Sequence, residues 1–296
     1  MTQTLVTEDE CTEELFVCES SFDKLRLVGH NWPIKNGPTR AVVLVVHGSG
    51  EHGQRYTHVA RFFNAHHIAC VNFDCRGHGQ SGGERGFTPC ADALHDDLEC
   101  IIARVETELY PGVPLVIYSH GTGSVICLTH IVRRPVQARR YHAIIISTPS
   151  LCLRKRPNAL SLFIARAFAN LDPHFRLPVE GNYTNEYTND PKVVEAYRKD
   201  PLVHDRWPSM TVSILLELAM LLEKSTVHPP CPFLIQHGGA DRTTPIVGIR
   251  KWVRKRVQGD VQMKEWLENY HELHNDTNKD EVFTFIVHWL ETKLKI

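Results

Sequence analysis

Apolar residues along the chain follow two patterns, short continuous runs and longer stretches with helical spacing. The runs are rich in β-branched residues, as expected for strands buried on both faces of a sheet. They occupy Ala41 to His47, Ile68 to Asp74, Pro114 to Ser119, Ala143 to Ser147 and Pro232 to His237. Between them, the clearest helical period runs from Leu94 to Leu109. This alternation predicts βαβ units on a mostly parallel, doubly wound sheet, the α/β fold class.

Both ends of the chain add elements to this predicted sheet. Glu14 to Glu19 and Lys24 to Gly29 are amphipathic, which favours an antiparallel hairpin at the sheet edge. A last strand is predicted at Val261 to Leu267. An apolar face recurs between Lys279 and Lys293, which predicts a closing helix.

The alternation stops between residues 150 and 230, where helical patterns and Pro, Asn and Asp breaks replace buried strands. The run at Pro232 then resumes the sheet. We therefore interpret 150–230 as an inserted helical cap, on a core made of two parts, 1–149 and 231–296.

The first predicted cap helix, Ala159 to Leu171, is strongly apolar and follows three basic residues, Arg154 to Arg156. We expect its apolar face to pack on the core, since apolar faces prefer burial. The alternative is an amphipathic element, Arg154 to Leu171, that docks at the membrane periphery. A second helix, Thr211 to Lys224, is apolar almost all round, which favours a packed position.

The composition narrows the classes of protein. The 296 residues include 33 Lys plus Arg and 34 Asp plus Glu, a formal net charge of −1, which argues against a nucleic-acid binder that works through a basic field. The nine cysteines are odd in number and form no C-x-x-C pair, which indicates core thiols in a reducing compartment. No run reaches the roughly 18 apolar residues of a spanning helix, and Met1 to Glu10 is polar. We expect a soluble cytoplasmic protein. Its 18 histidines direct attention to metal or acid–base chemistry.

Polar loops follow three predicted strands, where open α/β sheets place their ligands. The first loop, His47 to His52, reads HGSGEH, and a Gly-rich H-G-x-G turn there can point backbone N–H groups at a developing oxyanion. A metal site at His47 and His52 is the alternative. Their i, i+5 spacing and the lack of a third obvious ligand argue against it.

The other two loops supply an acid and a base. Asp241 follows one predicted strand and His271 follows the last, which fits the chain order nucleophile, Asp, His. The Asp would hold the imidazole in the right tautomer and stabilise the imidazolium that forms. A turn role for Asp241 and a structural role for His271 are the alternatives, which their joint order and context disfavour. His274 is a weaker base candidate because it lies further into the following polar run.

Four segments carry a resemblance to a known family. They are HGSGEHGQRY (His47 to Tyr56), FDCRGHGQSGGERG (Phe73 to Gly86), HGGADRTTP (His237 to Pro245) and YHELHND (Tyr270 to Asp276). The chain resembles, over nearly its whole length, the monoglyceride lipase and lysophospholipase branch of the α/β-hydrolase superfamily. That resemblance implies an α/β-hydrolase fold, a lipid-contacting cap, and cleavage of single acyl chains from glycerol or related lipids at a Ser-His-Asp site. It implies a relay at Asp241 and His271 and oxyanion N–H groups at Ser49 and Thr122, with no metal and no cofactor.

The nucleophile position departs from that family. The family's elbow reads G-H-S-x-G, whereas this chain reads SHGTGS from Ser119 to Ser124, with Gly121 at the apex. No acyl-enzyme can form on a residue without an Oγ. Glycine fits the strained apex and relieves about 1–3 kcal/mol that another residue would bear.

Losing the nucleophile of a triad costs on the order of 10⁶ in turnover, so efficient ester hydrolysis is not expected. Ser119 and Ser124 are the neighbouring candidates for a substitute nucleophile, but each is expected to lie several ångströms from the apex. A water activated by His271 is a third route. Two classes of function stay open: an impaired hydrolase of monoacyl lipid esters, and a catalytically inactive pseudo-hydrolase that binds a lipid or a protein. The third alternative is a stable fold that neither binds nor converts a small molecule.

Overall fold

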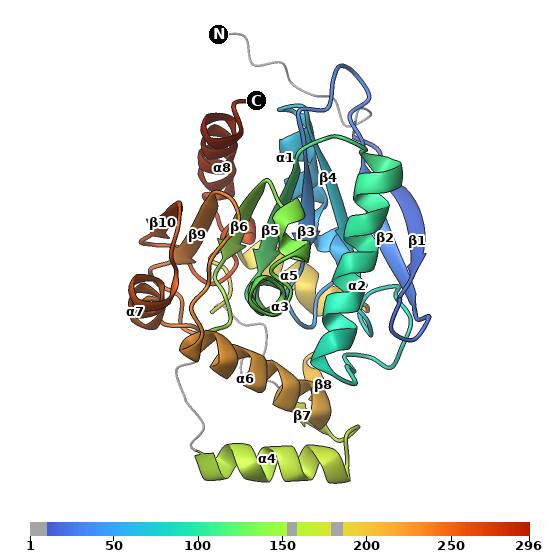
Figure 1. Ribbon diagram of the computed structural model, residues 1–296, viewed down its shortest axis with the longest axis vertical. Helices are drawn as coiled ribbons and strands as arrows, with labels where there is room; N and C mark the ends of the chain where they lie inside the picture. The colour runs from blue at the N-terminus through green and yellow to red at the C-terminus, as the bar shows by residue number, and fades with distance from the viewer. Residues whose placement is uncertain (1–10, 153–158, 179–185) are drawn as a thin grey trace.

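The computed structural model describes residues 11–152, 159–178 and 186–296. Its main sheet contains eight strands, which are β1 (Glu14–Glu19), β2 (Arg26–Trp32), β3 (Ala41–Val46), β4 (Ile68–Phe73), β5 (Leu115–His120), β6 (Ala143–Ser147), β9 (Phe233–Gly238) and β10 (Val261–Trp266). They lie in the order β1-β2-β4-β3-β5-β6-β9-β10 (Figure 1). From β4 to β10 every pairing is parallel, and β1 and β2 add an antiparallel hairpin at the edge. The predicted α/β class is confirmed.

The central strands are apolar throughout because both faces of the sheet are covered. Along β3, Val42, Leu44 and Val46 join one hydrophobic core, and the residues between them join the other. The first core includes residues of α2 (Ala91–Arg104), α3 (Gly121–Arg133) and α7 (Ile246–Arg256). The second includes residues of α1 (Thr57–Asn64) and α8 (Lys279–Leu294). A strand buried on both faces gives a continuous run instead of an alternation, which is why these strands could be found in the sequence.

Two predicted elements differ in detail. The second hairpin strand begins at Arg26 and continues to Trp32, beyond the predicted end at Gly29. The helical period from Leu94 to Leu109 is an α-helix only as far as Arg104, and a π-helical turn, Val105–Leu109, completes it.

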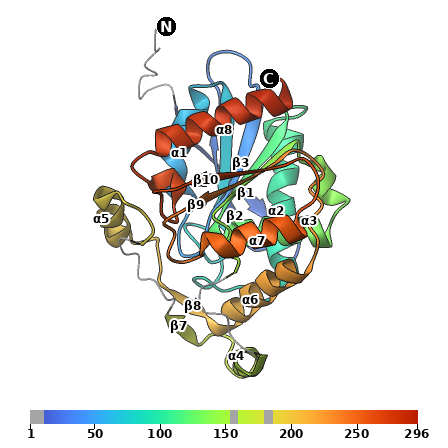
Figure 2. The same cartoon turned by 90° about the vertical axis from the view of Figure 1, so that its left-hand side faces the viewer.

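Between β6 and β9 the chain leaves the sheet and forms the cap. The cap comprises α4 (Ala159–Leu171), β7 (Arg176–Pro178), α5 (Pro191–Lys199), β8 (Arg206–Pro208) and α6 (Ser209–Lys224). The short strands β7 and β8 pair antiparallel and are absent from the sequence prediction, because three residues are too few to give a period. Figures 1 and 2 both show α6 between α4 and the core. The division into two core parts and a cap domain, 1–149, 150–230 and 231–296, stays a prediction.

The prediction that the first cap helix buries its apolar face on the core is wrong. In α4, Leu160, Phe163, Ile164 and Leu171 are between 56% and 84% exposed, whereas Ala169 is buried. The helix packs on α6, not on the sheet, so only part of its surface is covered. Arg154 to Arg156 lie outside the described residues. For α6 the prediction is confirmed, since Leu218 and Leu222 belong to the first core.

Within the described residues, neither a disulfide bond nor a membrane-spanning helix contributes to the fold. All nine cysteines are free thiols. Within the described ranges, no helix is long and apolar enough to cross a bilayer.

A close approach between α3 and β3 gives a test of this architecture. A Cβ on Gly123 would lie 2.3 Å from the carbonyl oxygen of Val46 and 2.5 Å from that of His47, both of which are backbone atoms. We expect Gly123→Ala to lower the free energy of unfolding by about 1–3 kcal/mol through overpacking, measured by denaturant titration. Gly82→Ala is the control, because its nearest contact would be 3.3 Å. Equal stability of the parent and Gly123→Ala would contradict this packing.

Candidate active site

The site lies where β3, β5, β9 and β10 end. Strand β5 ends at His120 and α3 begins at Gly121, so the turn between them is a single sharp step. Gly121 has φ +55°, in the left-handed region that side-chain-bearing residues rarely adopt. The predicted nucleophile elbow is thus present in backbone geometry, with glycine at its apex.

Asp241 and His271 meet although they follow different strands. His271 Nδ1 lies 2.8 Å from Asp241 Oδ2 and 2.9 Å from Thr243 Oγ1. Asp241 Oδ1 also accepts hydrogen bonds from the backbone N–H groups of Thr243 and Thr244, at 2.8 and 3.0 Å. The carboxylate is therefore fixed by its own loop and can orient the imidazole.

Asp241 and His271 each stabilise the charged form of the other. Burial disfavours the charged imidazolium, but the Asp241 carboxylate outweighs burial and raises the pKa of His271 above its ordinary value. Burial likewise opposes the ionised Asp241, yet the charge of His271 and its hydrogen bond lower the pKa of that carboxyl. This contact and this mutual stabilisation of charge are what the predicted relay of Asp241 and His271 requires.

The other face of His271 points at the elbow. A Cβ placed on Gly121 would lie 3.6 Å from His271 Nε2, 3.6 Å from Ser150 Oγ and 3.7 Å from Gly48 Cα, all ordinary contacts. One bond further out, a hydroxyl would come within the hydrogen-bond reach that a base needs, about 2.6–3.2 Å. The imidazole is aimed at a side chain that this sequence lacks.

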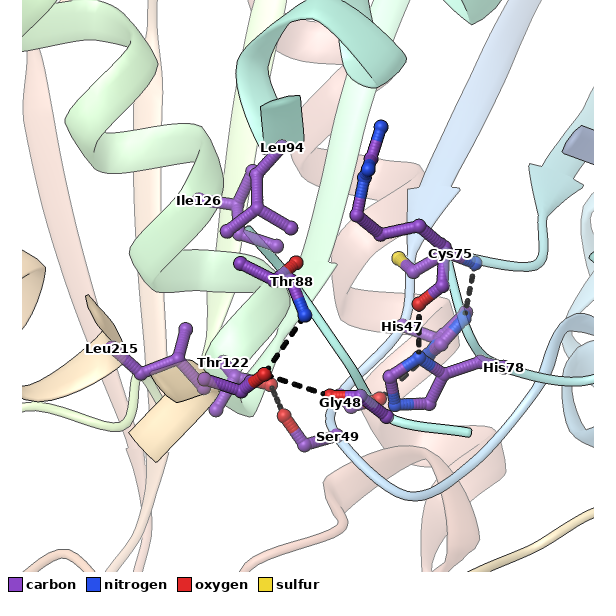
Figure 3. Close-up of a pocket in the computed structure, with 13 residues that line it drawn as sticks. His47, Gly48, Ser49, Cys75, His78, Thr88, Leu94, Thr122, Ile126 and Leu215 are labelled. Carbon is purple, nitrogen blue, oxygen red and sulfur yellow. Dashed lines mark hydrogen bonds between the residues drawn. The ribbon is translucent and has the colours of Figure 1, made fainter. Parts of the chain in front are cut away.

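Ser49 and Thr122, the predicted oxyanion residues, are neighbours. Their hydroxyl oxygens lie 2.6 Å apart and hydrogen-bond to each other (Figure 3). Among the hydrogen bonds of the described residues, none uses the backbone N–H of Ser49 or Thr122. Beside them is a small recess of about 30 Å³, with apolar walls that include Leu94, Ile126 and Leu215. Two N–H groups thus border an apolar space, as an oxyanion site requires.

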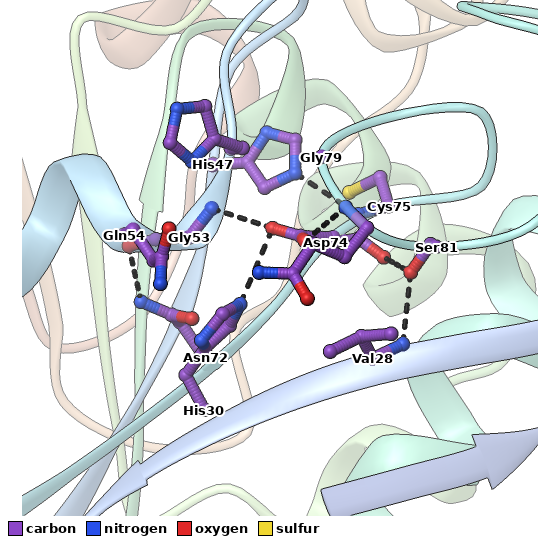
Figure 4. Close-up of polar contacts among 12 residues, drawn as sticks. Val28, His30, His47, Gly53, Gln54, Asn72, Asp74, Cys75, Gly79 and Ser81 are labelled. Atoms are coloured by element: carbon purple, nitrogen blue, oxygen red, sulfur yellow. Dashed lines mark hydrogen bonds and ion pairs between the residues drawn. The ribbon is translucent and has the colours of Figure 1, made fainter. Parts of the chain in front are cut away.

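Buried polar contacts hold the loop after β3 in place. Asp74 accepts hydrogen bonds from the N–H groups of Gly53 and Gln80, both at 2.7 Å (Figure 4). His47 Nε2 accepts one from Cys75 N–H at 2.9 Å. Burial alone would raise the pKa of Asp74, but the neighbouring His30 imidazole and the hydrogen bonds from these N–H groups lower it to about 2. The loop after β3 is therefore tied to the loop after β4.

Both histidines of the alternative metal site bond to protein groups. His47 Nδ1 lies 2.6 Å from the carbonyl oxygen of Gly48, while its Nε2 faces Cys75. His52 Nε2 lies 2.8 Å from Asp200 Oδ2 in the cap. The two imidazoles serve different contacts: His47 joins the loops after β3 and β4, and His52 joins core and cap.

Ser119, Ser124 and His274, the alternative nucleophiles and base, are buried in the core. Ser119 and Ser124 are fully buried, and Ser119 Oγ donates to Ser124 Oγ at 3.3 Å. His274 is also buried, where its ring stacks on Tyr56 at 4.6 Å. Burial lowers the pKa of His274 well below its ordinary value. These positions favour packing roles for all three.

Sequence reasoning missed a second buried charge network. Glu51 Oε1 accepts hydrogen bonds from Gly48 N–H at 2.6 Å and from Tyr56 Oη at 3.0 Å. Arg55 bridges Glu51 and Glu272, with nitrogen–oxygen distances of 3.2 and 3.0 Å. Burial would raise the pKa of Glu51, but the charge of Arg55 lowers it. The only signal in the sequence was that Glu51 and Glu272 lie in post-strand loops.

Two further residues at the site were also missed. Ser150 donates its backbone N–H to the Gly121 carbonyl at 3.0 Å, and Tyr187 of the cap packs edge-on against His271, with ring centroids 5.4 Å apart. Neither residue lies in a recognisable motif, so only the folded structure brings them to the site.

The raised pKa of His271 leads to a measurable prediction. In an NMR titration, His271 should have a pKa above 6.5, and in Asp241→Asn the value should fall below 6.5 because burial then acts without the carboxylate. Protonation of His271 stabilises the fold fully below the unfolded pKa, and this contribution is lost as pH rises through the folded pKa. Asp241→Asn should therefore destabilise the protein more below pH 6.5 than above the folded pKa.

Thr244→Val is the control, since it removes a hydroxyl contact to the same carboxylate but keeps its charge. A wild-type pKa of His271 at or below 6.5 would contradict the relay.

Comparison with known proteins identifies the family of the chain. A family model described as serine aminopeptidase S33 matches residues 37–278. The chain is 29% identical to a monoacylglycerol lipase of Mycolicibacterium smegmatis, over 91% of this chain and 94% of the relative. It is 26% identical to the monoglyceride lipase of Rattus norvegicus, over 87% and 83%. The structure of a soluble variant of monoglyceride lipase from Saccharomyces cerevisiae, in complex with a substrate analog, shares the fold, with a TM-score of 0.83 at 22% identity over 99% of both chains. The chain therefore belongs to the serine aminopeptidase S33 family of α/β-hydrolases and is monoglyceride lipase-like in sequence.

Proposed function

We propose that the protein binds single-chain acyl lipid esters, such as monoacylglycerols, beside Gly121, and turns them over slowly at most. One observation carries this proposal. The relay and the oxyanion residues surround Gly121 at distances that a serine side chain would fit, yet the attacking oxygen is missing. The monoacylglycerol and monoglyceride lipases among the relatives suggest the lipid class.

Each residue has a role that can be stated for the ester. The backbone N–H groups of Ser49 and Thr122 would bind the ester carbonyl oxygen. His271 would take a proton through Nε2, and Asp241 would hold its other nitrogen and stabilise the resulting charge. Binding and the oxyanion site alone leave about 10³–10⁴ over water when a nucleophile is removed. In residual hydrolysis a water molecule would attack the ester carbonyl carbon as its proton passes to His271, and His271 would return the proton to the alcohol oxygen as the ester C–O bond breaks.

Restoring the nucleophile tests the proposal directly. We expect Gly121→Ser to raise kcat/KM for a monoacylglycerol and for a short p-nitrophenyl ester by about 10³-fold or more, because every other part of the site is aligned. A fluorophosphonate should label this variant covalently, as measured by mass spectrometry, and leave the wild type unlabelled.

Gly121→Ala is the matched control, since it adds the Cβ and the strain of φ +55° without a hydroxyl. It should show neither gain, and His271→Ala should remove the activity of Gly121→Ser. If Gly121→Ser folds but stays as inactive as Gly121→Ala, the proposed alignment is wrong.

We further propose that α4 brings the cap to a lipid surface. Leu160, Phe163, Ile164 and Leu171 expose their side chains on one helix, and Phe175 just after it is 47% exposed. Such an apolar face suits the boundary between head groups and acyl chains. The nine free thiols agree with a cytoplasmic protein that meets membranes peripherally.

Vesicle flotation tests the membrane contact. Vesicles of phosphatidylcholine and phosphatidylserine should bind the wild type, and the double variant Phe163→Asp with Ile164→Asp should bind at least about tenfold less, since each buried side chain contributes about 1.5–3 kcal/mol. Val136→Asp is the control, because Val136 is 69% exposed but lies outside the cap. Equal flotation of all three proteins would argue against docking through α4.

A further inference from the structure

The elbow has the features of an anion-binding site as well as those of an ester-binding site that lacks a nucleophile. Gly121 opens α3, a helix of 13 residues, whose N-terminus carries partial positive charge. His271 is only 5% exposed, its Nδ1 is held by Asp241, and its Nε2 faces the place that a side chain on residue 121 would fill. The Thr122 N–H belongs to this helix terminus, so it, the Ser49 N–H and His271 Nε2 are the donors around one small volume.

A carboxylate matches these donors better than an ester does. An ester carbonyl offers one acceptor oxygen and no net charge. A carboxylate offers two oxygens, one for the backbone N–H pair and one for a protonated His271, in a charge-assisted contact that is stronger than a neutral hydrogen bond. A serine hydroxymethyl would occupy the space of the second oxygen, and glycine leaves that space open.

We propose that the site retains a free single-chain fatty acid, bound as its carboxylate at Gly121, in preference to the corresponding ester. This inference rests on the proposed function, since the same space beside Gly121 would hold the acyl chain. Leu94, Ile126 and Leu215 give apolar walls to the recess of about 30 Å³ that Ser49 and Thr122 also line, where the first part of the chain would lie (Figure 3).

Several charged groups surround His271. Three carboxylates act on it, from Asp241, Glu272 and Glu51. Arg55 bridges Glu51 and Glu272 and offsets one of their two negative charges, and Asp241 is the counter-ion of the imidazolium. One negative charge of the pair remains, so an incoming carboxylate depends on its direct contacts with His271 and with the backbone N–H groups. The other titratable groups near the ring are held neutral at neutral pH, because burial lowers the pKa of the imidazoles and raises that of the phenol; they are His120, His237, His274 and Tyr187.

Calorimetric titration with a matched pair of ligands, laurate and methyl laurate, tests the inference. Near neutral pH, laurate should bind wild-type protein at least about tenfold more tightly than its methyl ester. As pH rises above the pKa of His271, the affinity for laurate should fall by up to about tenfold per unit, while the affinity for the ester stays constant.

Two variants separate the anion contact from the acyl pocket. His271→Gln should remove the pH dependence and the preference for laurate, yet keep ester binding. Gly121→Ala should weaken laurate more than the ester, because its Cβ fills the space of one carboxylate oxygen. Thermal melts identify a variant that fails to fold, and the ligand pair and the pH series on the wild type do not depend on either variant.

The outcomes distinguish this inference from the function on which it rests. Equal affinities for laurate and methyl laurate, or a laurate affinity that is independent of pH, would overturn the inference and leave the proposed function standing. Binding of neither ligand, nor of a monoacylglycerol, would overturn both.

Discussion

The close packing of α3 against the end of β3 is the constraint on which the site depends. At Gly123 the helix backbone approaches the carbonyl groups of Val46 and His47 so closely that no side chain fits. That approach brings the first turn of α3 beside the loop after β3, so Thr122 can bond to Ser49. Two residues earlier, Gly121 has a positive φ in the tight turn between β5 and α3. The predicted oxyanion residues and the apex therefore lie together beside the first turn of α3.

Electrostatics then gives this backbone arrangement its chemistry. Asp241 is ionised because loop N–H groups and His271 satisfy it, and it favours the charged form of a fully buried imidazole. With a serine at the apex, such an imidazole acts as a base during attack. With glycine, the neutral imidazole has no hydroxyl proton to accept from the protein, and its Nε2 faces the open space beside Gly121. The absence of a hydroxyl oxygen at residue 121 therefore changes the chemistry open to Asp241 and His271, although their own contact is unchanged.

Most of the core could be predicted from the sequence, and part of the site. Buried parallel strands leave continuous apolar runs, and Asp241 and His271 follow such strands in a characteristic order. The exposed face of α4 could not be predicted, because its helical period is the same whether α6, the sheet or a lipid covers it. The contact between Arg55 and Glu272 could not be predicted either, since it joins residues 217 positions apart.

Retention of the relay residues without a nucleophile has a structural explanation that does not require catalysis. Asp241 accepts the N–H groups of its own turn, so its removal would leave buried donors unsatisfied, at about 1–3 kcal/mol each. The loop of His271 also docks the cap, through Tyr187 on its ring and through the Glu272 N–H that donates to the Tyr187 carbonyl. The folded state therefore constrains these residues independently of turnover. It constrains residue 121 as well, because a side-chain-bearing residue there would bear the strain of a positive φ, which glycine avoids.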